Sequence, residues 1–187
     1  MSAPASVDEL FELYELRGHE RYGEDVSQLE HALQCAALAR HHHASDELIT
    51  AALFHDVGHF VVDLQGAEDF NSERDDDDHQ AVGARVLAPI FGPLVAQPVA
   101  LHVTAKRWRC TREPAYVDQL SPTSRATLRA QGGLLTNDEC ERFEAHPGFA
   151  TALALRGWDD TAKQTEFVLG SLRDYEQLVR NLARPPR

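Results

Sequence analysis

Two histidines and an aspartate near the first third of the chain have the types and spacing to hold a metal ion. His55 and Asp56 are adjacent, and His59 follows His55 by four residues. An imidazole and a carboxylate side by side can both reach one metal ion. Positions i and i+4 share a helix face, so on one helix His59 would point into the same space as His55. The apolar run at residues 49–54 predicts a buried helix leading into this stretch.

Other histidines and aspartates lie on or beside apolar helix faces. These are His31, His79, His102 and Asp159. A single buried histidine is more often a core residue with a hydrogen-bond partner than a ligand. Together with His55 and Asp56, however, the set resembles the H…HD…D series of HD domains, an oxygen- and nitrogen-rich donor set. The two imidazoles beyond the four HD ligands indicate a second metal ion, with Asp56 bridging the pair.

Helical spacing recurs along the chain, whereas strand-like alternation is nearly absent. The expected helices cover residues 7–16, 28–41, 79–90, 94–106, 114–120, 122–131, 136–146, 149–156 and 171–182, with one more that Asp46 caps and that ends in the His55-Asp56 stretch. Ser27 or Asp25 could cap the second helix, and Thr136 with Glu139 fits a capping box. The sequence predicts an all-α fold: a single HD-domain helical bundle over residues 1–187, with its ligand core at about 22–163 and a terminal helix at about 171–183.

The composition and net charge of the chain limit the kinds of molecule that it is expected to bind. The chain has 187 residues, 43% apolar and 26% charged, which is typical of a globular domain with its own core. A net charge of −12 argues against nucleic acid, because neutralising phosphates needs Lys and Arg. It does not exclude an anionic substrate, since a few cations in a cleft outweigh the overall sign.

The expected location is the cytoplasm. Three widely spaced cysteines (Cys35, Cys110 and Cys140) fit a reducing compartment better than a disulfide framework. No secretory signal and no apolar run of membrane-spanning length is visible, so we expect no membrane partner. The cluster His41-His42-His43 is expected to be exposed at a helix C-terminus, and the four aspartates at 75–78 to lie in a solvated loop.

The chain resembles the HD-domain mixed-valent di-iron oxygenases that cleave carbon–phosphorus bonds, of the PhnZ and TmpB type. The resemblance extends from Tyr22 to about Thr165. It is carried by the segments Tyr22-Gly23-Glu24, Gln28-Leu29-Glu30-His31, Gln34-Cys35-Ala36, His55-Asp56-Val57-Gly58-His59, His79-Gln80-Ala81-Val82-Gly83-Ala84, His102-Val103-Thr104-Ala105-Lys106-Arg107, Leu120-Ser121-Pro122-Thr123-Ser124, Gln131-Gly132-Gly133 and Arg156-Gly157-Trp158-Asp159-Asp160-Thr161-Ala162-Lys163.

The resemblance implies a role for each matching position. The six that would hold two iron ions are His31, His55, Asp56, His79, His102 and Asp159. The four that would grip the phosphonate are His59, Lys106, Ser124 and Arg156. Tyr22 would ligate the substrate-binding iron and leave when substrate arrives, and Glu24 would move with it and face the substrate amine. A phosphonate dianion also favours charge-assisted donors on general grounds.

The reaction implied by the resemblance uses O₂ as co-substrate and breaks a C–P bond. The substrate would be an (R)-1-hydroxy-2-aminoethylphosphonate with or without N-methyl groups, and the products phosphate and glycine or glycine betaine. An upstream hydroxylase would supply the 1-hydroxy group. Residues 120–124 and 158–163 look more like the trimethylated-substrate branch. Aromatic faces suit a quaternary ammonium, and the candidates are Tyr22, Phe60, Phe70 and Trp108.

Three other functions fit part of the pattern. An HD phosphohydrolase acting on a small phosphate ester could use the same ligands to activate water, but it needs no displaceable Tyr22. A di-iron enzyme cleaving an inositol-like polyol would leave the cations Lys106 and Arg156 unexplained. A metal-binding module without catalysis would hold fewer than two irons per chain.

Overall fold

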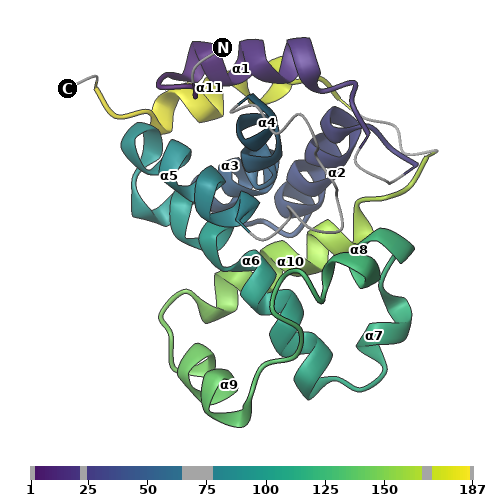
Figure 1. The fold of residues 1–187 in the computed structure, drawn as a ribbon. Helices are drawn as coiled ribbons and strands as arrows, with labels where there is room; N and C mark the ends of the chain where they lie inside the picture. Colours follow the sequence, from purple (N-terminus) through teal and green to yellow (C-terminus); the bar gives the residue numbers. More distant parts are fainter. Residues whose placement is uncertain (1–2, 22–24, 65–77, 166–169, 186–187) are drawn as a thin grey trace.

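A computed structural model of the chain describes residues 3–21, 25–64, 78–165 and 170–185 (Figure 1). These residues form eleven helices and no strand, which confirms the predicted all-α class. The helices are α1 (Val7–Arg17), α2 (Gln28–His41), α3 (Asp46–Phe54), α4 (Val57–Leu64), α5 (His79–Phe91), α6 (Pro93–Arg112), α7 (Tyr116–Gln119), α8 (Pro122–Thr127), α9 (Asn137–Glu144), α10 (Phe149–Thr161) and α11 (Arg173–Leu182).

Helix α3 lies in the interior of the molecule, against α2, α6, α10 and α11. All six side chains of residues 49–54 are buried, as this run, apolar except for Thr50, predicts. Ala51 and Ala52 lie at the middle of this run, where a small side chain lets the surrounding helices approach closely. Phe54 contacts the rings of Phe11 and Tyr14 from α1 at edge-on angles. This buried helix ends immediately before His55.

Two long helices carry the other half of the site. Helix α6 packs against α5 on one side and α10 on the other. Gly92, whose φ of +91° suits glycine, makes the turn between α5 and α6. Helices α1 and α11 lie side by side (Figure 1), joined by an ion pair of 2.6 Å between Asp8 and Arg180.

Several predicted helix ends were wrong. Ser45, not Asp46, caps α3, because its side chain accepts from the Leu48 N–H. Helix α6 continues past Lys106 to Arg112, since an apolar cluster including Ala105 and Trp108 packs it against α9 and α10. Residues 128–131, expected in the helix of α8, instead form turns.

Helix α10 also runs further than predicted, to Thr161 instead of 156. Ion pairs from Arg156 to Asp159 and Asp160, at i+3 and i+4, hold this last turn together. Asp159 consequently lies on a regular helix rather than in a loop. The capping box at Thr136 agrees with the sequence expectation. Of the two candidate caps of α2, the structure uses Ser27, which forms a second capping box with Glu30.

The stretch from His55 to His59 is not one continuous helix with the run before it. Helix α3 ends at Phe54 and α4 begins at Val57, so His55 and Asp56 form the turn between them. The inference that His59 shares a helix face with His55 was therefore wrong in its geometry. His59 belongs to α4 and comes to the site from a different direction.

The structure tests some of the remaining expectations from the sequence. The cluster His41-His42-His43 is exposed at the end of α2, as expected, and all three cysteines are buried and unpaired. Three of the four aspartates at 75–78 lie outside the described residues. Among the helices of the described ranges, not one has both the length and the apolar content needed to cross a bilayer.

Candidate metal centre and substrate pocket

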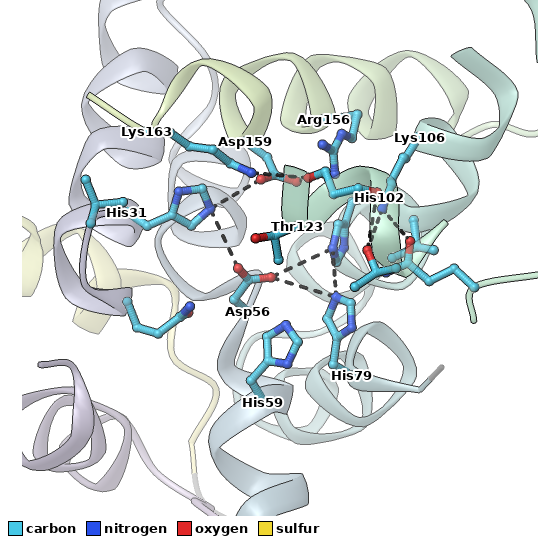
Figure 2. A pocket seen from close by; sticks show the side chains of 16 residues that line it. His31, Asp56, His59, His79, His102, Lys106, Thr123, Arg156, Asp159 and Lys163 are labelled. Carbon is cyan, nitrogen blue, oxygen red and sulfur yellow. Dashed lines mark hydrogen bonds and ion pairs between the residues drawn. The ribbon is translucent and has the colours of Figure 1, made fainter. Parts of the chain in front are cut away.

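A pocket opens where α2, α4, α5, α6, α8 and α10 meet, and its walls carry most of the predicted site residues (Figure 2). It encloses about 90 Å³, well below the roughly 300 Å³ at which sites for drug-sized ligands begin. All six predicted metal-ligating residues come together at its base, although they span residues 31 to 159 of the chain. The pocket suits a small ligand placed directly against these residues.

The four core histidines form two pairs. The Nε2 atoms of His31 and His55 are 3.2 Å apart, and those of His79 and His102 are also 3.2 Å apart. With metal–nitrogen bonds of about 2.1 Å, two nitrogens of one coordination sphere lie roughly 3.0–3.4 Å apart. Each pair therefore has the spacing of two ligands to one ion.

Asp56 lies between His31 on one side and His79 and His102 on the other (Figure 2), and it turns one oxygen to each histidine pair. Its Oδ2 is 3.6 Å from Nε2 of His31 and 3.3 Å from Nε2 of His55. Its Oδ1 is 3.8 Å from Nε2 of His79 and 3.9 Å from Nε2 of His102. This arrangement matches a carboxylate that bridges two metal ions.

Asp159 adds a second carboxylate to the first pair. Its Oδ1 lies 3.3 Å from Nε2 of His31 and 3.9 Å from Nε2 of His55. At the second pair, the His59 ring stacks on His79 with ring centres 4.1 Å apart. The two positions thus differ: one has an extra carboxylate, the other an extra imidazole nearby.

Backbone carbonyls determine which ring nitrogens are available. The Nδ1 atoms of His31, His55 and His102 lie 2.7, 2.9 and 2.7 Å from the carbonyl oxygens of Ala162, Ala52 and Val99. A carbonyl only accepts, so each Nδ1 carries the hydrogen and each neutral ring presents a lone pair at Nε2. In the first pair two lone pairs then face each other at 3.2 Å. A cation between them removes this repulsion, so the residues fit a metal ion.

The charges of the site favour the same arrangement. Complete burial lowers the pKa of His55, but Asp56 and Asp159 outweigh burial and raise its pKa to about 9, so the two carboxylates favour positive charge at this position. Burial, with His79 and His55 nearby, lowers the pKa of His102 to about 3, which keeps that imidazole neutral. Burial opposes ionisation of Asp56, but the neighbouring histidines hold its pKa well below the usual range.

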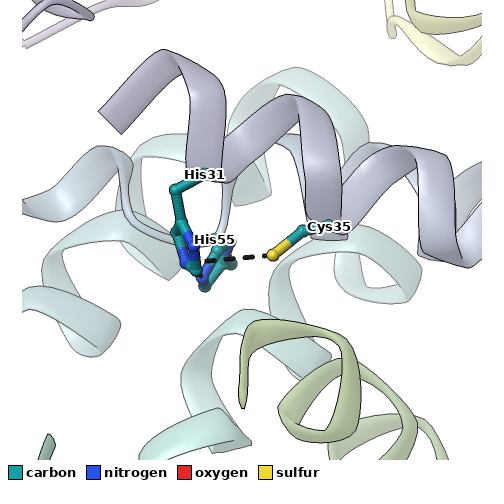
Figure 3. Close-up of side chains that lie close together, drawn as sticks. All are labelled: His31, Cys35 and His55. Carbon is teal, nitrogen blue, oxygen red and sulfur yellow. Dashed lines mark hydrogen bonds between the residues drawn. The ribbon is translucent and has the colours of Figure 1, made fainter. Parts of the chain in front are cut away.

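Cys35 lies beside the first pair, a feature to which the sequence analysis gave no role. Its Sγ is 3.8 Å from Nε2 of His31, one turn earlier on α2, and close to His55 (Figure 3). Burial, together with the charges of Asp159 and Asp56, raises the pKa of this thiol well above its usual value. The group is therefore a protonated thiol beside the candidate ligands His31 and His55.

Two lysines supply positive charge to the pocket. Lys106 on α6 is buried and donates to Thr127 Oγ1 at 2.9 Å and Gln131 Oε1 at 2.7 Å. Lys163 donates to the hydroxyl oxygens of Ser121 and Ser124, both at 3.2 Å. Lys106 and Ser124 were predicted to bind substrate, whereas Lys163 was missed. Its position four residues after Asp159 was the available signal.

Arg156 also lines the pocket, but its guanidinium points largely to protein groups. It donates to Asp159, to Asp160 and to the hydroxyl of Tyr116. The charges of both aspartates hold its pKa well above the usual value despite the cost of burial. The predicted contact between Arg156 and a phosphonate thus competes with three internal partners.

Five other predicted residues are not among the described residues that line the pocket. Tyr22 and Glu24 lie outside the described residues, as does Phe70. Phe60 is buried against Tyr14, with ring centres 5.0 Å apart. The indole of Trp108 packs against Phe149 and donates to Glu144. Among the described residues, the expected aromatic faces for a quaternary ammonium are therefore not at the pocket.

Comparison with known families identifies the fold around this site. The model of the family described as HD domain matches residues 15–131, which include five of the six candidate ligands. The chain belongs to the HD domain family. Only Asp159 lies beyond the matched segment, and helix α10 brings it back to the HD residues.

Two relatives of this HD domain are similar along most of its length. A hydroxymethylphosphonate dioxygenase of Gimesia maris is 45% identical over 173 residues, covering 92% of this chain and 86% of that protein. A [1-hydroxy-2-(trimethylamino)ethyl]phosphonate dioxygenase (glycine-betaine-forming) of Leisingera caerulea is 35% identical over 155 residues, covering 82% of this chain and 78% of that protein. The predicted resemblance to HD-domain oxygenases acting on phosphonates is therefore confirmed.

Proposed function

We propose that this HD domain is a di-iron dioxygenase that uses O₂ to cleave the C–P bond of a small 1-hydroxyphosphonate. The observation that carries the proposal is the Asp56 carboxylate, which turns one oxygen to each of two histidine pairs. A site for two ions bridged by a carboxylate is what di-iron chemistry needs. The similarity to two phosphonate dioxygenases gives the class of reaction.

Six residues would hold the metals. His31, His55 and Asp159 would hold one iron, His79 and His102 the other, and Asp56 would bridge them. When bound, the irons supply the activation of O₂ and the redox capacity that no side chain has. The protein's own contribution is orientation: carbonyl oxygens hold three imidazole rings with Nε2 directed inward.

The lysines of the pocket would bind the phosphonate. Lys106 and Lys163 donate to neutral hydroxyl and amide oxygens, partners that a dianion can replace or join with stronger charge-assisted bonds. Ser124 and His59 line the same cavity and can donate to the remaining oxygens. We also propose that Tyr22 and Glu24 act as the family resemblance implies, with Tyr22 giving way to the incoming substrate.

Hydroxymethylphosphonate is the substrate we favour. The relative with 45% identity is named for it, the cavity is small, and the described lining residues offer no aromatic ring other than imidazoles to meet a quaternary ammonium. The balanced reaction is HOCH₂PO₃²⁻ + O₂ → HCOO⁻ + HPO₄²⁻ + H⁺. The C–P bond breaks, carbon is oxidised to the carboxylate level and O₂ is reduced.

The second candidate is 1-hydroxy-2-(trimethylamino)ethylphosphonate, towards which two sequence segments lean and for which the second relative is named. Its products would be phosphate and glycine betaine. In either case a hydroxylase acting earlier is expected to supply the 1-hydroxy group.

Oxygen uptake measured together with phosphate release tests the proposal. Protein reconstituted with Fe²⁺ without oxygen is mixed with hydroxymethylphosphonate or with the amino, methylamino and trimethylamino 1-hydroxyethylphosphonates. We expect one phosphate per O₂, with the highest kcat/KM for hydroxymethylphosphonate. Phosphate release without oxygen consumption would establish the phosphohydrolase alternative instead. The highest kcat/KM for the trimethylated compound would establish the second candidate.

A further inference from the structure

Arg156 donates hydrogen bonds to Asp159, which is a proposed metal ligand, and to two groups beside it. It is only 4% exposed. Its Nη1 donates to Asp159 Oδ2 at 2.6 Å, its Nη2 to Asp160 Oδ1, and its Nε to the Tyr116 hydroxyl at 3.0 Å. A guanidinium offers five N–H donors in a rigid plane. All three nitrogens of the Arg156 guanidinium therefore donate to protein groups.

The two oxygens of Asp159 have different partners. Oδ2 accepts from Arg156, while Oδ1 lies 3.3 Å from Nε2 of His31 on the metal side. A carboxylate held at one oxygen cannot rotate freely about its last torsion. The arginine therefore determines which oxygen faces the His31 and His55 pair, and in what orientation.

A second group of residues holds Arg156 itself. The Tyr116 hydroxyl accepts from Arg156 and donates to Asp160 Oδ2 at 2.6 Å. Arg109 reaches the same Asp160 oxygen at 3.1 Å and lies over the Tyr116 ring, 4.0 Å from its centre. Asp160 thus accepts from three donors contributed by α6, α7 and α10, which fixes the plane of the guanidinium.

We propose that Arg156 is a positioning residue for the metal ligand Asp159, and that Tyr116 and Asp160 keep Arg156 in place. The inference rests on the proposed metal site but not on its reaction. It has an asymmetric consequence, since Asp159 faces the His31 and His55 pair. Weakening the network should lower metal affinity at that pair and leave the His79 and His102 pair unchanged.

Fe²⁺ titration without oxygen and without phosphonate tests this asymmetry. The variants are Tyr116→Phe, which removes one hydroxyl and keeps the ring, Arg156→Lys, which keeps the charge but not the fork, and Arg156→Gln. Changes around a metal ligand cost about 10- to 100-fold in metal affinity. In Arg156→Gln we expect the Fe²⁺ affinity of one of the two sites to fall by about that factor. In Tyr116→Phe and Arg156→Lys we expect a smaller fall at the same site. Arg112→Gln, the same change at an exposed ion pair with Glu144, is the matched control.

Variants of the two histidine pairs assign the weakened site. In a His79→Ala background the remaining strong site is the one at His31, so adding Tyr116→Phe or Arg156→Gln should weaken it. In a His31→Ala background the same additions should change nothing. Parental affinity at both sites, or equal loss in both backgrounds, would overturn the proposal. Because no turnover is measured, failure of the oxygenase assay and failure of this experiment are separate results.

Discussion

At the scale of single residues, the site is organised by which atom of a side chain faces which neighbour. The two oxygens of Asp56 face two different histidine pairs, and the two oxygens of Asp159 face His31 and Arg156. Three histidines donate from Nδ1 to a backbone carbonyl, so that Nε2 faces the site. Such partners orient a ligand before any metal arrives.

Removing the Asp56 carboxylate should empty both metal positions. In Asp56→Ala the two histidine pairs lose the group that faces them both, so we expect iron per chain to fall far below the parental value, with a loss of stability. Iron analysis of protein reconstituted without oxygen measures this. Asp118→Ala, at an exposed position of α7, should keep parental iron. Parental iron in Asp56→Ala would contradict the bridging assignment.

Removing the Lys106 charge should weaken substrate binding without affecting the metals. A hydrogen bond to a charged group contributes about 1.5–3 kcal/mol, so Lys106→Met should lower kcat/KM for a phosphonate by roughly 10- to 100-fold, through a higher KM and a lower kcat. Iron content should match the parent. Steady-state oxygen uptake and iron analysis together give the answer, and unchanged kinetics would remove Lys106 from the phosphonate site.

At the scale of elements, close contact between α4 and α5 brings Asp56 and His79 together. Gly58 lies in the first turn of α4, and a Cβ there would overlap the carbonyl oxygen of His79 and come within 2.9 Å of the Gly83 nitrogen. Both groups are backbone, which cannot turn aside as a side chain can. A glycine at this position lets the two helices approach closely enough for one carboxylate to serve both histidine pairs.

Gly58→Ala should therefore destabilise the fold. Overpacking costs about 1–3 kcal/mol, and the displacement of α5 should also reduce iron at the His79 and His102 pair. Gly157→Ala is the matched control: it lies within α10 with no atom within 4 Å of an added Cβ. It should be neutral or stabilise by up to about 1 kcal/mol, because alanine favours helix. Urea denaturation of the iron-free proteins measures both. Equal stabilities for the two variants would contradict the close contact.

At the scale of the whole molecule, the candidate ligands cross-link five elements. His31 comes from α2, His55 and Asp56 from the turn after α3, and the others from α5, α6 and α10. Ions bound here would tie together helices whose ligands are separated by up to 128 residues, from 31 to 159. The metals should accordingly contribute to stability as well as to chemistry.

Removing the metals should lower the melting temperature. Binding to the native state alone stabilises by about 2.7 kcal/mol per site when the free metal is at 100 times its Kd. Thermal unfolding without oxygen, with Fe²⁺ or with a chelator, measures the difference. In Asp56→Ala the addition of Fe²⁺ should shift the melting temperature little. An equal shift in parent and variant would mean that the metal acts elsewhere on the chain.

Several features of the molecule were predictable because they depend on local sequence. The apolar run at 49–54 predicted a buried helix, and Thr136 with Glu139 predicted a capping box that the structure contains. The break after Phe54 and the full length of α10 were not predictable. They depend on contacts with residues far along the chain, such as the approach of α5 to Gly58 and the ion pairs of Arg156.

The sequence alone determined the donor types of the candidate site: four imidazoles and two carboxylates in the order of an HD domain, with Lys106 to meet an anion. The type of a side chain determines whether its atoms can bind a metal or donate a hydrogen bond, and this property does not depend on how the helices pack. Only the tertiary structure decided how the donors are shared. That Asp56 faces both histidine pairs, that Arg156 holds Asp159, and that Lys163 joins Lys106 at the pocket depend on distances between distant residues, which helix packing alone sets.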